Sequence, residues 1–347
     1  MHKLPFLYSV IFSLLLGLTF GGTMLTIFVI PREVEGDITE TIDLSAFTKP
    51  EPPTESPTFV LTLPSLGGTP EPPAEGDSDE LISTDAPTEP PILYPIITEN
   101  SYLDEQISIV ISTLREFGSD FYIADVQISD PFLLKTAFAQ DRYGLNITEK
   151  PSEQARRVGA ILAINGDYYG ANEKGYVIRN GTIYRTSVRT HDEKHRKYFE
   201  DLAFLWNGDL VPFDEKTTTI DDLKSMGVFH VFAFGPTLLK NGEIVVDADT
   251  EVGVSNPNGN PRTAIAQIAA GHYLFVCADG RTDVSRGPTL LELATVLQRL
   301  GAVTAYNLDG GGSATMYFNG RVVNKPCTHW NEIMERGGSD IVYIGYN

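Results

Sequence analysis

Residues 307–316 read Asn-Leu-Asp-Gly-Gly-Gly-Ser-Ala-Thr-Met, and this stretch decides how the rest of the chain is interpreted. An apolar run, residues 302–306, leads into Asn307 and Asp309, and three consecutive glycines follow. Such glycines cost backbone entropy and pack no side chain, so they are expected where a ligand approaches the main chain or where several N–H groups face one anion. A plain turn is the alternative, but β-prone runs on both sides place the glycines inside a domain. We interpret this stretch as an active-site loop.

The sequence before the loop predicts a strand–helix–strand unit. Residues 273–278 are typical of a strand, 288–300 of a helix and 302–308 of a second strand. A connection of this length favours a right-handed crossover between parallel strands, whose carboxyl ends lie at one edge of a sheet. Asp279 and Asp309 follow the two strands directly, so we expect Asp279, Arg281 and Asp309 to lie close together.

The rest of the chain predicts hairpins and a few helices. Asn-Gly pairs at residues 180, 207, 241 and 319 each separate apolar or β-branched runs, which is a hairpin signal. Residues 107–114 carry apolar side chains at helical spacing, residues 121–128 alternate like a strand, and residues 151–157 begin with proline like a short helix. The predicted fold class is α+β, with a mixed, hairpin-rich sheet, packed helices and the C-terminal strand–helix–strand unit.

Charge and composition vary strongly along the 347 residues, whose net charge is −20. Residues 33–99 hold fifteen acidic side chains against Lys49 alone. No basic stripe is present, so nucleic acid is not expected as a partner. Cys277 and Cys327 have no metal-site spacing, and a disulfide between them stays open.

The N-terminal third predicts an anchor and a linker. Residues 4–30 contain no charged side chain, which favours a transmembrane helix over a cleaved signal peptide. Residues 33–98 are acidic and rich in proline, which favours an extended, disordered linker. The expected domains are therefore a membrane anchor (1–32), a linker (33–98) and a catalytic domain (99–347). The expected location is the cell membrane, with the catalytic domain outside the cytoplasm.

Four motifs in a fixed order give the most specific functional signal. They are Ile-Asn-Gly-Asp-Tyr-Tyr at 164–169, Asn-Pro-Arg-Thr-Ala at 260–264, Asp-Gly-Arg at 279–281, and the stretch at 307–316. In this combination the chain resembles the phosphodiester glycosidase family over roughly residues 120–347. The resemblance implies a hydrolase that cleaves a sugar–phosphate diester at the sugar carbon. Such a reaction needs a carboxylate together with cationic or N–H groups that bind phosphate.

The candidate residues follow from this chemistry. Asp167, Asp279 and Asp309 are the candidate catalytic carboxylates, although aspartate beside glycine is often only turn chemistry. Arginine binds phosphate through two parallel hydrogen bonds, although a salt bridge is an equal alternative for each arginine. The candidate substrate-binding residues are Asn165, Arg262, Arg281, Asn307, Gly310, Gly311, Gly312 and Ser313.

Three functions stay open at this stage. The first is hydrolysis of glycosyl-1-phosphate diesters in an envelope or exopolysaccharide glycan. The second is a non-catalytic extracellular module that binds polysaccharide, and the third is a metal-dependent phosphodiesterase. No cofactor is expected, although a divalent cation bound by the aspartates stays open because hard cations prefer carboxylate oxygens.

Overall fold

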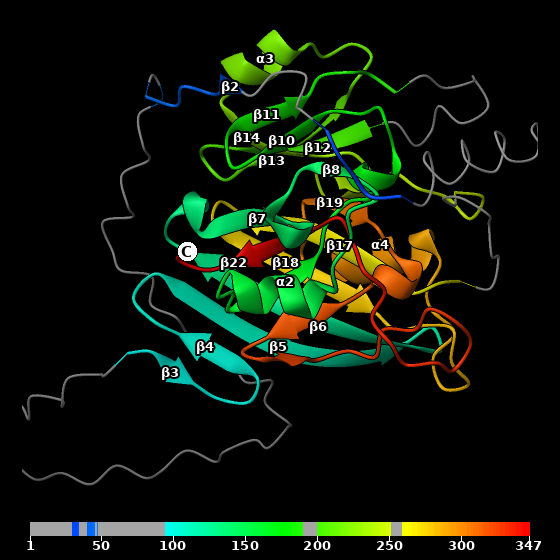
Figure 1. Ribbon diagram of the computed structural model, residues 1–347. Coiled ribbons are helices and arrows are strands. Elements are labelled where there is room, and N and C mark those ends of the chain that lie inside the picture. Colours follow the sequence, from blue (N-terminus) through cyan, green and yellow to red (C-terminus); the bar gives the residue numbers. More distant parts are fainter. Residues whose placement is uncertain (1–29, 35–39, 46, 48–93, 190–199, 251–258) are drawn as a thin grey trace, which may run out of the picture.

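The computed structural model describes residues 30–34, 40–45, 47, 94–189, 200–250 and 259–347 (Figure 1). In this part of the chain strands dominate, and the α-helices are α2 (Pro151–Arg157), α3 (Ile220–Ser225) and α4 (Leu290–Arg299). The expected α+β class is therefore wrong, because the described chain is built mainly from β-sheets with three short helices on their surfaces. Short 3-10 turns lie at Pro131–Leu133, Ala139–Asp141, Tyr169–Ala171 and Gly311–Ser313.

A nine-stranded sheet forms the base of the domain. Its order is β16-β15-β19-β17-β18-β6-β5-β4-β3. The strands are β3 (Ile96–Ile97), β4 (Ser101–Leu103), β5 (Ile107–Glu116), β6 (Ser119–Ile128), β15 (Thr237–Lys240), β16 (Glu243–Ile244), β17 (Arg262–Ala269), β18 (His272–Ala278) and β19 (Thr304–Leu308).

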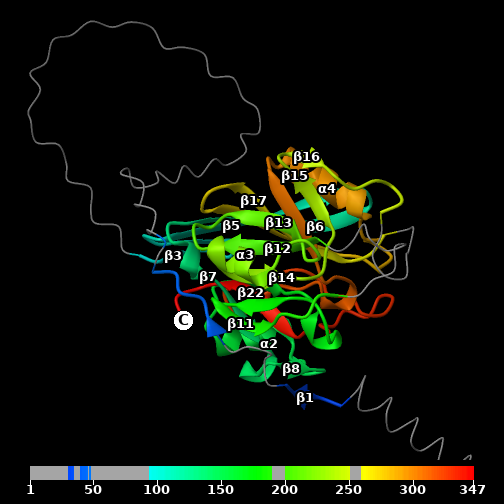
Figure 2. The ribbon, with the colours of Figure 1, turned by 90° about the horizontal axis from the view of Figure 1, so that it is seen from above.

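Two further sheets lie against this base, as Figures 1 and 2 show from two directions. The five-stranded sheet has the order β21-β20-β9-β22-β7 and the six-stranded sheet the order β13-β12-β14-β10-β11-β2, while β1 pairs only with β8. The five-stranded sheet holds β7 (Leu134–Phe138), β9 (Leu162–Asn165), β20 (Met316–Phe318), β21 (Arg321–Val322) and β22 (Asp340–Ile344). The six-stranded sheet holds β2 (Glu40–Thr41), β10 (Val177–Arg179), β11 (Thr182–Arg185), β12 (Glu200–Leu205), β13 (Leu210–Asp214) and β14 (Val228–Phe232). The separate pair is β1 (Arg32–Glu33) with β8 (Gly144–Leu145).

The predicted strand–helix–strand unit is present as β18, α4 and β19. Both strands pair antiparallel with β17, which lies between them, so β18 and β19 run parallel to each other. Asp279 and Asp309 therefore leave the sheet at the same edge, where Arg262 begins β17. Helix α4 starts at a capping box formed by Thr289 and Glu292, and each cap of this kind stabilises a helix by about 1 kcal/mol.

The expected helix over residues 107–114 is wrong, because this segment is β5. Ile107, Ile109 and Ile111 are buried, whereas Val110 between them is 37% exposed. This alternation matches a strand with one face on the core, and the β-branched side chains favour it. The segment ends in a two-residue hairpin at Phe117 and Gly118, which both have positive φ.

The four Asn-Gly pairs at residues 180, 207, 241 and 319 all lie at hairpins. They connect β10 to β11, β12 to β13, β15 to β16, and β20 to β21. At Asn180, Asn241 and Asn319 both residues of the pair have positive φ, as a type I′ turn requires, while at the pair that begins with Asn207 only the glycine does.

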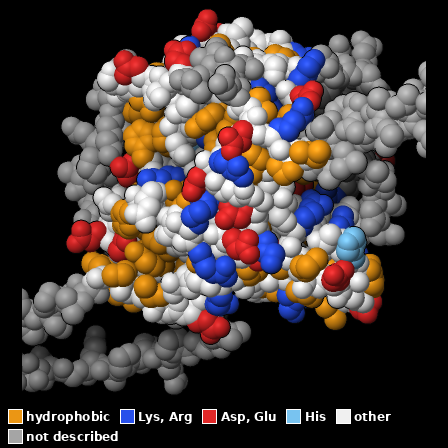
Figure 3. Space-filling model, viewed as in Figure 1, with side chains coloured by type: hydrophobic (Ala, Val, Ile, Leu, Met, Phe, Trp, Pro, Cys, Tyr) orange, Lys and Arg blue, Asp and Glu red, His pale blue; other side chains and the backbone are white. Residues whose placement is uncertain are grey.

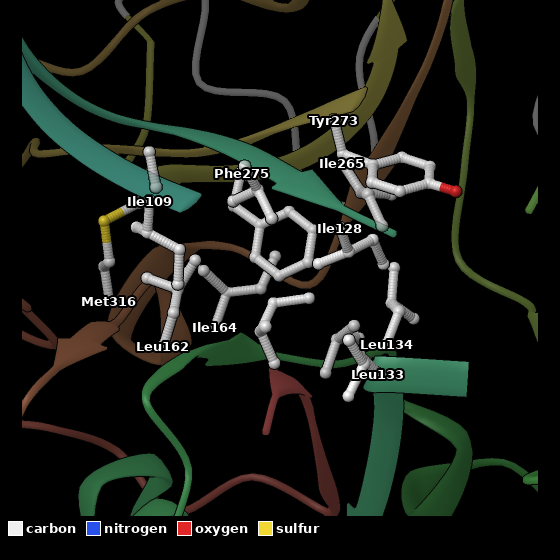
Figure 4. Packing of buried hydrophobic residues seen from close by; sticks show 14 of the residues in the cluster. Ile109, Ile128, Leu133, Leu134, Leu162, Ile164, Ile265, Tyr273, Phe275 and Met316 are labelled. Atoms are coloured by element: carbon white, nitrogen blue, oxygen red, sulfur yellow. The ribbon is translucent and has the colours of Figure 1, made fainter. Parts of the chain in front are cut away.

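The main hydrophobic core lies where the three large sheets meet. Figure 4 shows Phe275 and Ile265 from the nine-stranded sheet facing Leu162, Ile164 and Leu134 from the five-stranded sheet. Phe204 and Phe232 complete this core from the six-stranded sheet. A second core lies between α4 and the opposite face of the nine-stranded sheet, and α2 covers the outer face of the five-stranded sheet. Burying Leu290, Leu293 and Leu297 of α4 stabilises the fold by about 1.5–3 kcal/mol each. Cys277 and Cys327 are both buried and free, so they form no disulfide with each other.

Side chains cover the outer edge of β7, the last strand of the five-stranded sheet. Asn180 accepts a hydrogen bond from the Thr136 N–H (3.2 Å) and donates one to the Thr136 carbonyl (2.9 Å). His230 Nε2 bonds the Leu134 carbonyl at 3.1 Å, and Arg157 donates to the Phe138 carbonyl at 2.9 Å. Burial lowers the pKa of His230 to about 3, so this ring is neutral.

The predicted membrane anchor (1–32) lies almost wholly outside the described residues. In the part of the chain that is described, no helix is both long and apolar enough to cross a membrane. Some of the segment expected to be a disordered linker packs on the domain instead. Glu40 and Thr41 pair with β11, Ile42 is buried, and the ring of Phe47 lies 5.3 Å from that of Trp206.

Candidate functional site

The glycine loop, residues 309–315, joins β19 to β20 across the edge of the nine-stranded sheet. Its glycines are explained by close packing on both sides. A Cβ on Gly310 would lie 2.6 Å from the Pro261 carbonyl oxygen, and one on Gly312 would lie 2.3 Å from Thr328 Oγ1. Gly311 has a φ of +60°, which suits glycine, and its N–H donates to the Pro261 carbonyl at 2.8 Å. The backbone of the motif at 260–264 therefore packs against the glycine loop of the motif at 307–316 and holds it by a hydrogen bond.

Asp309 has the setting of a reactive carboxylate. Its side chain is 12% exposed and lies 3.3 Å from Arg336, whose own side chain is 42% exposed. The Ser313 hydroxyl donates a hydrogen bond to the Asp309 carboxylate. It also accepts a hydrogen bond from Arg336 Nε at 3.1 Å. Burial raises the pKa of Asp309, while Arg336 and Ser313 oppose this shift. The carboxylate is thus held in place by a partly exposed cation and a buried hydroxyl.

Arg281 brings a second guanidinium to the same loop. Its side chain donates to Asn260 Oδ1 (3.3 Å) and to the Thr328 carbonyl (2.9 Å). A Cβ on Gly311 would lie 3.0 Å from Arg281 NH2, so the guanidinium rests directly on the glycine loop. Burial lowers the pKa of Arg281, and the nearby charge of Arg336 lowers it further.

The two cations, Arg281 and Arg336, are called the arginine pair below. They repel each other, and Asp309 is the carboxylate whose charge acts on both. A second anion at this position would relieve the repulsion and would accept hydrogen bonds from guanidinium groups. The site is therefore suited to a ligand that carries a phosphate.

Asn165 holds the loop in place rather than facing a ligand. Its amide donates to the Asp309 carbonyl at 2.6 Å. Its side-chain oxygen accepts from the Thr263 hydroxyl (2.7 Å) and from the Thr315 N–H (3.2 Å). Asn165 is 2% exposed, so this one side chain joins three of the four sequence motifs inside the protein.

Asp167 lies in a separate, fully buried group with Arg179 and Asp340, called the buried clamp below. Arg179 NH2 lies 2.9 Å from Asp167 and 2.8 Å from Asp340. Asp167 also accepts the N–H groups of Tyr169 and Ala233. Burial raises the pKa of Asp340 well above its ordinary value, against the opposing effect of Arg179. The side chains of this clamp are at most 2% exposed, so they are almost completely covered by the protein.

The other predicted site residues tie loops together. Asp279 accepts the Asn324 side chain (3.1 Å) and the Lys325 N–H (2.9 Å), and burial raises its pKa. Arg262 is 4% exposed and donates to the Pro288 carbonyl at 3.3 Å. Asn307 donates to the Gly235 carbonyl at 2.7 Å. The structure thus brings together Asp309, Gly310, Gly311, Gly312, Ser313 and Arg281, and it gives the other candidates buried contacts of their own.

Three residues of these clusters were not among the sequence candidates: Arg336, Arg179 and Asp340. Arg336 lies in a glycine-containing segment, Glu-Arg-Gly-Gly at 335–338, which is a weak signal. Arg179 ends one apolar run and Asp340 begins another. A charge at the end of a strand usually faces solvent, so only the folded arrangement identifies this pair.

The described residues contain no group of three or more His, Cys, Asp or Glu side chains arranged to hold a metal ion. A cavity of about 250 Å³ lies away from the glycine loop, beside β7 and β22. Its wall includes Thr136, Phe138, Tyr184 and Tyr343. Acidic and basic side chains are interspersed on the face shown in Figure 3 rather than gathered by sign.

The fold and site define a β-sheet domain with one carboxylate and two arginines arranged around a glycine loop, as suits a phosphate-bearing ligand. Residues 158–344 match the phosphodiester glycosidase family model, and the chain belongs to this family. The resemblance seen in the four motifs is thereby confirmed.

Relatives of this chain include proteins of differing length. A SPbeta prophage-derived uncharacterized protein, YomE, of Bacillus subtilis (strain 168) is 27% identical over 279 residues, which are 74% of this chain and 40% of YomE. The human N-acetylglucosamine-1-phosphodiester alpha-N-acetylglucosaminidase is 36% identical over 110 residues, which are 28% of this chain and 21% of the human protein. The chain therefore spans well under two thirds of the length of these curated relatives.

The fold is shared with a solved structure among those that match this chain. It is the catalytic domain of zebrafish N-acetylglucosamine-1-phosphodiester alpha-N-acetylglucosaminidase, auto-inhibited by its pro-peptide. The match has a TM-score of 0.53 at 22% sequence identity and covers 70% of this chain and 83% of that one.

Proposed function

We propose that this protein is a hydrolase that cleaves glycosyl-1-phosphate diesters at the bond between the sugar carbon and the phosphate oxygen. One observation carries the proposal: the arginine pair lies beside the buried Asp309 carboxylate on the glycine loop. Family membership supports the reaction class, and the human relative is named for this type of bond.

The residues divide the chemistry between them. The arginine pair binds the phosphate, which leaves as a phosphate monoester and needs little protonation. Asp309 lies within hydrogen-bond distance of Arg336, and in this proposal the sugar end of the bound phosphodiester lies at Asp309. The oxygen of a water molecule forms a bond to the anomeric carbon as the carbon–oxygen bond to phosphate breaks. The Asp309 carboxylate takes the proton from that water, and Ser313 keeps the carboxylate oriented.

Isotope-labelled water tests the bond that breaks. The full chain is incubated in ¹⁸O-water with the methyl ester of α-N-acetylglucosamine-1-phosphate. Under the proposal, the label enters the free sugar, and Asp309→Asn releases no sugar while still folding. Label in the phosphate would instead indicate a phosphodiesterase. Binding without any product, for this ester and for matched esters of other sugars, would indicate a polysaccharide-binding module.

The same reaction in the presence of a chelator tests whether a metal cation takes part. The same reaction is run after treatment with EDTA, and again after adding Mg²⁺, Ca²⁺ or Mn²⁺. The arginine pair supplies positive charge in the proposed mechanism, so we expect sugar release to be unchanged by EDTA. Loss of activity that one cation restores would show that the aspartates need a metal.

The natural substrate that we propose is a phosphodiester-linked glycan of the cell envelope or an exopolysaccharide, met outside the cytoplasm. The uncharged residues 4–30 and the acidic, proline-rich residues 33–98 support this location. Protease treatment of intact cells tests it. An exported domain is digested from outside, whereas a domain that stays protected until the cells are lysed contradicts the proposal.

A further inference from the structure

An exposed tryptophan stands next to the proposed site. A β-bridge between Cys327 and Ile333 closes the tip loop, residues 327–333. Trp330 lies within this loop and is 63% exposed, more than any other described large hydrophobic side chain. Figure 1 shows the segment in red-orange at the right-hand edge of the domain, and apolar side chains lie on that part of the surface in Figure 3. An indole that faces solvent to this extent needs an explanation.

The orientation of Trp330 is fixed by Asp283. The indole N–H donates to Asp283 Oδ1 at 3.1 Å, and the Asn331 amide donates to Asp283 Oδ2 at 2.9 Å. The Asp283 N–H in turn donates to Asn331 Oδ1 at 2.9 Å. The only polar atom of the indole is therefore used to hold it, and much of the ring stays open to solvent. A ring held in this way loses little entropy when a ligand covers it.

The tip loop is tied directly to the arginine pair. The Asn331 N–H donates to the Arg281 carbonyl at 2.9 Å, and the Arg281 guanidinium donates to the Thr328 carbonyl. On the other side of the loop, the Arg336 N–H donates to the Gly312 carbonyl. In this chain of contacts Arg281 comes between Asp309 and Trp330. A phosphate bound by Arg281 is therefore held beside the tip loop that carries Trp330.

The chemistry around Trp330 favours a sugar ring. The C–H face of a pyranose packs on an aromatic surface, and its hydroxyl groups need polar partners at the edge of that surface. Asp283 and Asn331 supply such partners beside the indole. Val284, Ile333 and Met334 are also exposed nearby, but the carboxylates of Asp283 and Glu332 disfavour an anionic lipid surface.

We infer that Trp330 is a stacking platform for a sugar unit on the acceptor side of the phosphate, so the substrate is a phosphodiester within a longer glycan. This inference rests on the proposed function. It goes further by assigning a subsite to the part of the substrate that is not cleaved.

Two probes with the same cleaved bond test the platform in the full chain. The short probe is the methyl ester of α-N-acetylglucosamine-1-phosphate, and the long probe carries the same sugar phosphate on a primary hydroxyl of maltotetraose. We expect Trp330→Ala to lower kcat/KM for the long probe by about tenfold through KM, as loss of an aromatic contact does. The short probe changes less than about twofold, and Trp330→Phe keeps most of the preference for the long probe.

A matched control and a binding readout separate the possible failures. Ile97→Ala removes another exposed apolar side chain, 46% exposed on β3, and leaves both probes unaffected. The chain has two tryptophans, so in a Trp206→Phe background the fluorescence reports Trp330 alone. We expect the long probe, and not the short one, to change this fluorescence.

Three other outcomes would contradict either the proposed function or the stacking role of Trp330. A fluorescence response without turnover of either probe would overturn the proposed function and keep the platform. An equal effect of Trp330→Ala on both probes, or no effect on either, would overturn the platform. Binding to phosphatidylcholine vesicles that is lost in Trp330→Ala, with no response to the long probe, would assign the tip loop to lipid instead.

Discussion

Two clusters in this domain combine arginine with aspartate, and they differ in exposure. In the buried clamp, the side chain of Arg179 is 2% exposed and those of Asp167 and Asp340 are fully covered. In the arginine pair beside Asp309, Arg336 is 42% exposed and Asp309 is 12% exposed. The clamp joins β10 to β22 and to the segment after β9, whereas the pair surrounds a loop that opens to solvent.

The charge balance of the two clusters differs as well. The clamp has one cation between two carboxylates, and Arg179 also donates to the carbonyls of Ile178 and Val231. The site has two cations around one carboxylate, and the cations lie close enough to repel each other. Excess positive charge at a partly exposed position is suited to binding an anion, while a buried and fully bonded arginine is suited to holding strands together. The same residue types therefore serve structure in one cluster and chemistry in the other.

The largest expected effect is on turnover in Asp309→Asn. Asparagine keeps the size of the side chain but cannot accept a proton, so kcat should fall by about 10³-fold or more. The free energy of unfolding should change by less than about 1 kcal/mol, because no buried partner loses its only bond. Sugar release and urea unfolding measure the two quantities. Near-normal turnover in a folded variant would remove Asp309 from the reaction.

The second prediction concerns the clamp. Arg179→Gln leaves two buried carboxylates without their cation, so the free energy of unfolding should fall by about 3–5 kcal/mol. Urea unfolding followed by circular dichroism measures this loss. A variant as stable as the parent protein, but inactive, would contradict the comparison, because Arg179 would then act in the chemistry rather than in the fold.

The third prediction uses pH. Arg336 opposes the increase that burial causes in the pKa of Asp309, so Arg336→Gln should raise that pKa further. Activity that needs the Asp309 carboxylate is lost as the pH falls through this pKa, so the acidic limb of the kcat/KM profile should move to higher pH. At its optimum the variant should lose about 10- to 100-fold in kcat/KM, because one phosphate contact is missing. An unchanged acidic limb would show that Arg336 does not act on the titrating group.

The smallest effect separates backbone strain from contact with Arg281. Gly311→Ala and Gly242→Ala both place a side chain at positive φ, +60° and +78°, and each should cost about 1–2 kcal/mol in stability. A Cβ at Gly242 meets no atom within 4 Å, whereas one at Gly311 meets the Arg281 guanidinium. Only Gly311→Ala should therefore raise KM, by a few-fold. Equal KM values in steady-state assays of the two variants would argue against phosphate binding by Arg281.

Much of the local structure could be predicted from sequence because short-range chemistry determines it. The Asn-Gly hairpins, helix α2 and the crossover from β18 to β19 follow from turn residues, a proline and a leucine face. The segment that begins at Ile107 is a strand rather than the expected helix, and its sequence alone does not decide between them because its apolar residues fit both periods. Its alternation, seen in buried Ile107, Ile109 and Ile111, is decided by the core that its neighbour β6 completes.

The site was only partly predictable, because some of its residues are adjacent in the sequence and others meet only after folding. Asp309 and its three glycines are contiguous in the sequence, so a local motif identifies them. The predicted crossover from β18 to β19 brings Arg281 near them. Arg336 reaches Asp309 from 27 residues away, and Asp340 reaches Arg179 across 161. No local pattern specifies such pairs, and the exposure that distinguishes Arg336 from Arg179 exists only once the sheets have packed.

The covered edge of β7 has a consequence for how copies of this protein behave together. An unprotected strand edge offers a row of N–H and carbonyl groups on which another chain can add a strand. On β7 the side chains of Asn180, His230 and Arg157 already occupy those groups. The five-stranded sheet therefore cannot be extended by a neighbouring molecule at β7, and the domain resists edge-to-edge aggregation there even when many copies are crowded together.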